Sequence, residues 1–204
     1  MAIKPVFYRS GVGNDIWKPR HVLLFSGHMI DAPSRIRPRF PAEYEPIAAQ
    51  KITATLEQIS AGFLDLGMTQ GACGGDLLFS EACLQLGVKL QLLQPFDEAT
   101  FIKESVIPVD ANWLQRYQRI TNKLEIPPSA APQALGVLPS TMNAYERCNL
   151  WLLASALAYG SEKLIFICLW DGNDVDEPGG TAHMVREVEK QNGQVIWLNT
   201  KQLW

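Results

Sequence analysis

The chain has 204 residues and a formal net charge of −3, with 47% hydrophobic and 19% charged residues, a globular balance that excludes a disordered or fibrous protein. The acidic balance supplies no whole-chain basic field, which argues against nucleic acid as a partner. No apolar run approaches the roughly 20 residues of a membrane span, no signal-peptide pattern opens the chain, and the four cysteines form no C-x-x-C pair, so we expect a cytoplasmic protein without membrane contact.

Strand and helix patterns alternate along the chain. Residues 1–19 are polar and irregular, and we expect them to form an arm laid over the sheet. Short apolar runs are typical of strands buried on both faces of a parallel sheet, and they span 21–25, 67–71, 89–93, 163–170 and 194–198. Apolar stripes at helical spacing and helix caps predict helices between them, over 52–63, 77–86, 143–159 and 181–191.

This alternation predicts an α/β fold with crossover connections. We expect a doubly wound, mostly parallel sheet of about five strands, with helices on both faces and with residues 22–25 in a central strand. Residues 127–139 are rich in proline and alanine and are expected to form a surface loop. Without a repeat or a linker, we expect residues 1–204 to form a single domain, and a homo-oligomer is left open.

In open sheets of this kind, ligands bind beyond the carboxyl ends of the strands, where the strand order reverses. The first segment after a strand is unusual in combining a glycine, two polar groups and a group of arginines. A glycine permits a sharp turn, and arginines donate paired N–H bonds to phosphate, although a solvated loop is the simpler alternative. The residues concerned are Ser26, Gly27, His28 and Asp31, followed by Arg35, Arg37 and Arg39.

A second candidate segment precedes the predicted helix at 77–86. It contains Gly71, Gly74, Gly75 and Asp76. Glycines before a helix can leave backbone N–H groups facing an anion, and the helix dipole adds partial positive charge. Asp76 is explained equally well as an acid that caps the helix without any ligand.

The third candidate segment is the start of the helix predicted at 143–159. Asn143 is a suitable N-cap, and Arg147 and Asn149 lie one turn or more beyond it. Arg147 lies in an apolar stretch, so its guanidinium either reaches the surface along the helix or points into a site. Both readings stay open, and we include Arg147 and Asn149 among the candidate ligand-binding residues.

The fourth candidate segment gives the strongest single signal. A strand end, a polar loop, a double glycine and a helix start succeed one another, which is an anion-binding geometry. The candidates are Asp171, Pro178, Gly179, Gly180 and Thr181. The threonine hydroxyl can donate to a phosphate, and an ordinary loop with a good N-cap is the alternative.

Other familiar sites are missing from the sequence. The three histidines share no metal-ligand spacing, and neither a Walker-type phosphate loop nor a G-x-S-x-G elbow is present. We therefore predict no metal and name no cofactor. Cys73 before the second helix is a candidate nucleophile, although a small residue packed in a tight loop is the commoner case.

Three motifs carry a family resemblance over roughly residues 22–198: G-A-C-G-G-D at 71–76, R-C-N at 147–149 and P-G-G-T at 178–181. In this order and strand context, the chain resembles the superfamily that joins the DNA-processing Smf proteins to the lonely-guy phosphoribohydrolases. The resemblance implies a Rossmann-like fold and a ligand that is a nucleotide, a nucleotide derivative or nucleic acid. It also implies the ligand-binding roles of the glycine loops.

The sequence departs from the hydrolase members of that superfamily. Their P-G-G-x-G-T-x-x-E motif ends in a catalytic Glu, whereas the position three beyond Thr181 is Met184. We therefore expect a domain that binds or senses a nucleotide-derived, phosphate-bearing small molecule. The alternative is an N-glycoside hydrolase acting on a nucleoside monophosphate, which needs two carboxylates. Its candidate acids are Asp31, Asp76, Glu81, Asp171 and Glu177.

Overall fold

A computed structural model of the chain describes residues 3–9, 16–110, 112–173, 179–191 and 193–204. Its centre is a parallel sheet of six strands in the order β4-β3-β2-β1-β5-β6. The strands are β1 (Val22–Gly27), β2 (Leu66–Thr69), β3 (Lys89–Gln94), β4 (Ser129–Ala130), β5 (Leu164–Trp170) and β6 (Gln194–Asn199). In register, Val22 pairs with Leu66 on one side and with Leu164 on the other, so β1 lies inside the sheet.

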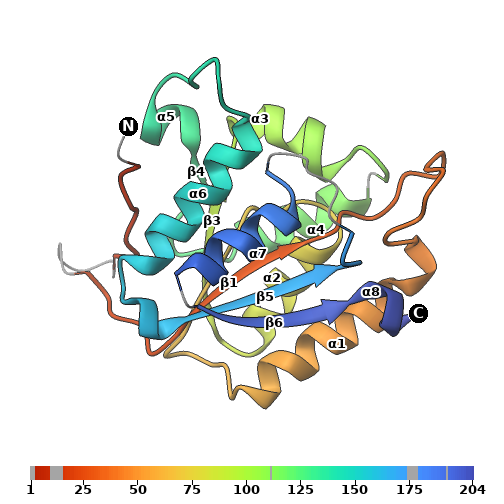
Figure 1. Cartoon of the computed structure of the whole chain (residues 1–204), viewed down its shortest axis with the longest axis horizontal. Helices are drawn as coiled ribbons and strands as arrows, with labels where there is room; N and C mark the ends of the chain where they lie inside the picture. The colour runs from red at the N-terminus through yellow and green to blue at the C-terminus, as the bar shows by residue number, and fades with distance from the viewer. Residues whose placement is uncertain (1–2, 10–15, 111, 174–178, 192) are drawn as a thin grey trace.

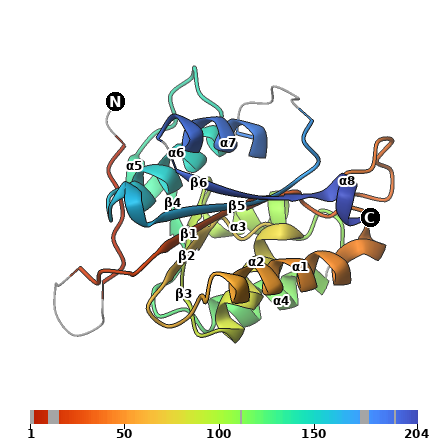
Figure 2. The ribbon, with the colours of Figure 1, turned by 60° about the horizontal axis from the view of Figure 1, so that its bottom comes forward.

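Helices connect the strands and lie on both faces of the sheet (Figures 1 and 2). Helices α1, α2 and α4 cover one face, and α5, α6 and α7 cover the other. The bounds are α1 (Glu45–Gln58), α2 (Gly75–Gln85), α3 (Glu98–Phe101), α4 (Asn112–Thr121), α5 (Ala131–Leu135), α6 (Ala144–Leu157), α7 (Thr181–Lys190) and α8 (Thr200–Leu203). Short 3-10 segments at Ala42–Tyr44 and Ser161–Lys163 and a π-helical turn at Ile102–Val106 complete the elements of the described residues.

Two apolar cores, one on each face, hold the helices to the sheet. Successive side chains of a strand point to opposite faces, and in β1 Leu23 and Phe25 belong to the core under α1 and α2, whereas Val22 and Leu24 belong to the core under α6. Both faces of β1 are therefore buried, which explains its unbroken apolar sequence. This layered, doubly wound arrangement is Rossmann-like and confirms the predicted fold class.

The structure differs from the sequence expectations in three local features. The sheet has six strands rather than about five, because Ser129 and Ala130 add an edge strand inside the segment predicted to be a surface loop. That segment also contains α5. Helix α1 ends at Gln58, so Phe63 is not on its stripe and is 73% exposed.

The described part of the N-terminal arm packs along α6 rather than across the open sheet. The backbone N–H of Val6 donates to Ser155 Oγ at 3.0 Å, and the indole N–H of Trp151 donates to the Lys4 carbonyl at 3.1 Å. Tyr8 is buried in the core on that side. None of the helices in the described part of the chain combines the length and apolarity that crossing a bilayer requires.

Candidate functional site

The strand order reverses between β1 and β5, and an open cleft lies there at the carboxyl ends of the strands. From β1 the chain proceeds through β2 and β3 to β4 on one side, and then returns to add β5 and β6 on the other. A cavity of about 1,070 Å³ occupies this position. Its lining comes from the end of β1, the loop after β1, the end of β5 and the start of α7, which is where ligands bind in open sheets.

The end of β1 forms the floor of this cleft. Gly27 and His28 line the cavity. Ser26 lies just beneath, and its Oγ is 3.2 Å from Thr181 Oγ1, which joins β1 to the first residue of α7. The backbone N–H of His28 donates to the Leu169 carbonyl at 2.9 Å, so the sheet pairing of β1 with β5 continues into the floor.

His28 and Asp171 form a buried pair at the base of the cleft. The imidazole Nε2 accepts the Asp171 backbone N–H at 3.1 Å and lies 3.3 Å from Asp171 Oδ1. Burial, together with the positive charge of Arg39, lowers the pKa of His28 to about 4, so the ring is neutral at pH 7. Although burial acts to raise it, the pKa of Asp171 is held below its usual range, chiefly by the hydrogen bond from the Asn173 backbone N–H.

Asp31 organises the loop between β1 and α1. Its Oδ2 accepts the backbone N–H groups of Arg39 at 2.7 Å and Phe40 at 2.8 Å, and its Oδ1 lies 3.2 Å from Arg35 Nε. These bonds fix the loop backbone, which gives the Asp31 carboxylate a structural role. Asp31 lines a neighbouring cavity and does not line the cleft.

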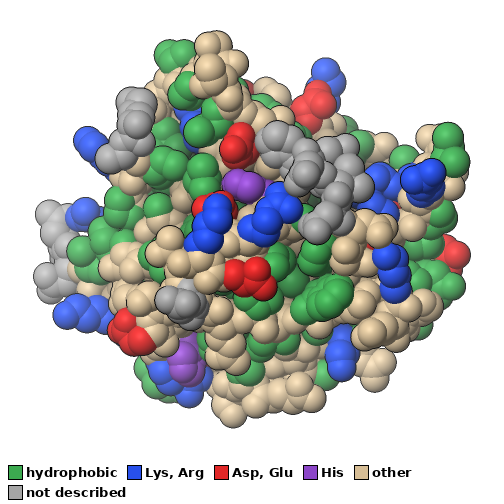
Figure 3. All heavy atoms as spheres, viewed as in Figure 1, with side chains coloured by type: hydrophobic (Ala, Val, Ile, Leu, Met, Phe, Trp, Pro, Cys, Tyr) green, Lys and Arg blue, Asp and Glu red, His purple; other side chains and the backbone are tan. Residues whose placement is uncertain are grey.

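The loop held by Asp31 carries positive charge to the rim of the cleft. Arg35, Arg37 and Arg39 all line the cavity, and Figure 3 shows Lys and Arg side chains gathered at this end of the molecule, over the loop that follows β1. Arg37 is exposed and makes no ion pair among the described residues. Beside it, Ile36 is 95% exposed, so an apolar side chain stands among the cations.

The glycine pair Gly179 and Gly180, directly before α7, packs against the N-terminal part of α6. The Asn149 amide donates to the Gly179 carbonyl at 2.7 Å and accepts from Gln70 at 2.7 Å. A Cβ on Gly179, whose φ is +92°, would lie 2.6 Å from the Glu146 backbone N, so only glycine fits this approach. Pro178 lies outside the described residues.

The start of α7 faces the cleft, as expected from the sequence. Gly180 is its N-cap, and Thr181 and Ala182 line the cavity. The first backbone N–H groups of a helix lack intrahelical partners and carry partial positive charge. The helix start therefore adds to the positive potential that the arginines create on the opposite wall.

In the glycine loop before α2, residues 71–75, several backbone N–H groups are already bonded within the protein. The Gly71 and Ala72 N–H groups donate to the Asp76 carboxylate at 3.2 and 3.3 Å, and the Gly75 N–H donates to the His28 carbonyl at 3.0 Å. Gly74 packs directly against the backbone of His28 and Ile30. This loop positions the floor of the cleft, and a ligand-contacting role for it stays a prediction.

The candidate acids among the described residues make structural bonds or lie away from the cleft. Burial raises the pKa of Asp76 to about 6, against several hydrogen bonds that favour the ionised form. Glu81 pairs with Arg116 at 2.5 Å, and Glu187 on α7 pairs with Lys190 at 2.6 Å. Met184 is buried in the core. Glu177 lies outside the described residues.

Neither a metal nor a reactive thiol is indicated in the described part of the chain. No group of three His, Cys, Asp or Glu side chains there could hold a metal ion. Cys73 is buried, and burial raises the pKa of its thiol to about 12. A thiol in this environment stays protonated and is a poor nucleophile.

Arg147 does not lie in the cleft. It is buried in a second, smaller cavity beyond β3, where its Nη1 donates to the Gly136 carbonyl at 2.9 Å. The alternative in which Arg147 reaches the surface along α6 is therefore wrong, because the side chain is only 5% exposed. The sequence pattern could not show that the loop between α5 and α6 would surround Arg147.

Some cleft residues were not among the candidates. Met29 and Asn173 belong to the lining, and Lys201 on α8 donates to Asn173 Oδ1 at 2.8 Å. The arginines of the lining were among the candidates, because they alternate along the chain after a strand-end glycine. Lys201 gave no signal, because β6 and α8 bring it to the site from the far end of the chain.

Comparison with known proteins gives only remote likenesses. No protein-family model and no curated protein matches the chain. Among solved structures, it is similar to DNA processing protein A from Helicobacter pylori, which binds single-stranded DNA, with 14% identity, a TM-score of 0.37 and coverage of 98% of this chain and 91% of that chain. It is also similar to Streptococcus suis SuiB bound to S-adenosylmethionine, with 7% identity, a TM-score of 0.28 and coverage of 90% of this chain and 48% of that chain.

Two expectations are corrected by the first of these structures. It binds single-stranded DNA, which contradicts both the expected nucleotide-derived small molecule, sensed or hydrolysed, and the argument against nucleic acid as a partner. The physical reason lies in the charge distribution. A net charge of −3 averages over the whole chain, whereas Arg35, Arg37 and Arg39 concentrate positive charge on one loop at the cleft.

Proposed function

We propose that the chain binds single-stranded nucleic acid in the cleft at the carboxyl edge of the sheet. The observation that carries this proposal is the arginine loop at the rim of the cleft, opposite the start of α7. Arginine guanidinium groups and helix N-termini are the two protein groups that most readily hold phosphate oxygens. The motif resemblance to DNA-processing Smf proteins agrees with this assignment.

The shape of the cleft favours a single strand of nucleic acid over a mononucleotide. Its volume of about 1,070 Å³ is at the upper end of the range of about 300–1,000 Å³ that is usual for small-molecule sites, so it has room for more than one nucleotide. Arg35 and Arg37 are exposed on the loop at its rim, and Arg39 is half-buried beside them. Exposed cations track a continuous phosphate backbone, whereas a single phosphate is usually enclosed.

Apolar groups in the same cleft provide a surface for bases. Trp170 is partly exposed at the end of β5 and contacts the Trp197 ring at a centroid distance of 5.6 Å. Met29 lines the floor and Ile36 stands on the rim. Single-strand binding combines a positively charged groove with aromatic and apolar contacts to unstacked bases, and both are present here.

The chemistry of the acids supports binding over bond cleavage. Asp31 and Asp76 accept hydrogen bonds from backbone N–H groups, and the Asp171 carboxylate accepts from the backbone and side-chain N–H groups of Asn173. A general acid that works near neutral pH needs a raised pKa and access to substrate. Among the candidate acids that the structure describes, only Asp76 has a raised pKa, and it is buried beneath the cleft floor.

The test is the affinity for a fluorescein-labelled oligo(dT) 20-mer, measured by anisotropy, in the wild type and in the double variant Arg35→Gln, Arg37→Gln. We expect the affinity to fall at least tenfold, or about 1.4 kcal/mol, because two phosphate contacts are lost. Neither residue is buried in a core, so the fold should be retained.

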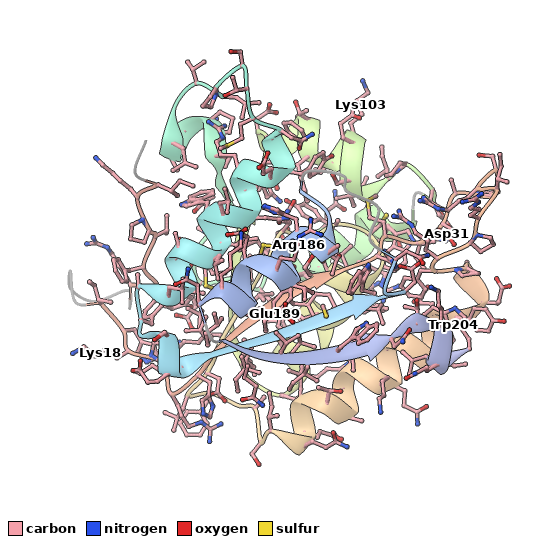
Figure 4. All side chains as sticks on the ribbon, in the orientation of Figure 1. Lys18, Asp31, Lys103, Arg186, Glu189 and Trp204 are labelled. Carbon is pink, nitrogen blue, oxygen red and sulfur yellow. The ribbon has the colours of Figure 1, made fainter. Side chains whose placement is uncertain are left out.

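The matched control is the double variant Lys18→Gln, Lys123→Gln, which removes the same charge. Both lysines are exposed, and Figure 4 shows Lys18 at the opposite end of the molecule from Asp31 and its loop. We expect this control to change the affinity less than twofold. Equal losses in the two double variants would show a non-specific charge effect and would reject the cleft as the site.

A further inference from the structure

Arg147 is a buried cation without an acidic partner. Its side chain is 5% exposed, and within the described residues it makes no ion pair. The only bond of its guanidinium there runs from Nη1 to the Gly136 carbonyl at 2.9 Å. Its Nε is buried and has no hydrogen-bond partner.

The guanidinium lines a cavity whose other walls are apolar. This cavity measures about 300 Å³ and shares no lining residue with the cleft between β1 and β5. The loop between α5 and α6, at the top of Figure 1, forms one side, and the residues after β3 form the other. The apolar lining consists of Pro95, Phe96, Pro132, Val137, Leu138 and Ala144.

A charge in such surroundings is costly unless an opposite charge joins it. The penalty for burying an unpaired ion is several kcal/mol, and a single backbone carbonyl offsets only part of it. Among the described residues, its sequence neighbour Glu146 makes no ion pair, and no acid lines the cavity. The arrangement is therefore suited to an anionic group that enters from outside.

We propose that this cavity binds a small monocarboxylate with an apolar body, such as an aryl or short alkyl carboxylic acid. The fork of N–H donors on a guanidinium matches the two oxygens of a carboxylate. The proline, phenylalanine and valine walls match an apolar body, and about 300 Å³ is at the small end of ligand sites.

A monocarboxylate fits this cavity better than a phosphate does. A phosphate monoester brings a charge of about −1.5 to −2 at pH 7, which one cation leaves partly unpaired among apolar groups. The cavity also offers no second cation among its lining residues. This site is independent of the nucleic-acid cleft, since the two use different residues.

The test is calorimetric titration of the full chain with sodium benzoate, with benzamide as the uncharged probe of the same shape. We expect one benzoate per chain, bound at least tenfold more tightly than benzamide, and no competition from an equal concentration of inorganic phosphate. In Arg147→Met the affinity for benzoate should fall at least tenfold, while oligo(dT) affinity stays within twofold of the wild type.

A second variant keeps the test decisive if Arg147→Met does not fold. Val137 is 93% exposed at the rim of the cavity, so Val137→Asp should fold normally. It places a carboxylate near the guanidinium and should lower benzoate affinity at least fivefold, whereas the neutral control Val137→Asn should not. Equal binding of benzoate and benzamide, full competition by phosphate, or unchanged affinity in Val137→Asp would each overturn the proposal.

Discussion

Gly74→Ala is expected to lower the free energy of unfolding by about 2–5 kcal/mol, because the new methyl group has no room and the backbone has a positive φ. Its Cβ would lie 2.5 Å from the Ile30 backbone N and 2.8 Å from the His28 carbonyl oxygen, at a φ of +93°. A left-handed conformation costs a non-glycine residue about 1–2 kcal/mol, and overpacking against backbone adds about 1–3 kcal/mol.

The control for this variant is Gly87→Ala. Gly87 also has a positive φ, of +73°, but a Cβ there would meet no atom within 4 Å. Its expected cost is therefore the conformational part alone, about 1–2 kcal/mol. Urea unfolding of both variants separates the two contributions. Similar losses at the two positions would show that the contact between the glycine loop and the cleft floor is not tight.

His28→Gln is expected to change how stability depends on pH. The pKa of His28 is lowered to about 4 by burial and by Arg39, whereas an unfolded histidine titrates near 6.5. As the pH falls below about 6.5, His28 takes up a proton in the unfolded state but stays neutral in the folded state until about pH 4. The wild type should therefore lose up to about 3 kcal/mol relative to the variant between pH 6.5 and pH 4.

The comparison with the variant is necessary because Asp76 acts in the opposite direction. Its pKa is raised to about 6 by burial, so the folded state takes up a proton before the unfolded state does, and stability rises as the pH falls through 6. In the wild type the two effects partly cancel. Urea unfolding of both proteins at pH 7, 6, 5 and 4.5 isolates the histidine, and parallel curves would contradict the neutral, buried state of His28.

The fold was predictable because most of its strands are buried on both faces. Residues 163–170 are a near-continuous apolar run that coincides closely with β5, and the leucine-rich segment 89–93 coincides closely with β3. Strand β4 has two residues, and no periodicity can be recognised over that length. The end of α1 was misplaced because Phe63 continues the apolar spacing by chance after the helix has stopped at Gln58.

The candidate site was predictable only in part, because local patterns do not specify tertiary partners. The ends of β1 and β5 were expected to meet a ligand site, and Gly27, His28, Asp171 and Thr181 do line one cavity. The glycine loop before α2 has the pattern of an anion site, yet its Gly75 N–H is taken by the His28 carbonyl. The prediction that nucleic acid is not a partner relied on net charge, which does not show that three arginines lie together at the cleft.

The salt dependence of oligo(dT) affinity tests the proposed nucleic-acid cleft most directly. Each phosphate contact to a single strand contributes about −0.7 to the slope of log K against log salt concentration. Three cleft arginines therefore predict a slope of about −2 for the wild type, and Arg35→Gln, Arg37→Gln should make it shallower by about 1.4. The Lys18→Gln, Lys123→Gln control should keep the wild-type slope. A slope near zero, or one that the arginine substitutions leave unchanged, would contradict binding of a phosphate backbone at this cleft.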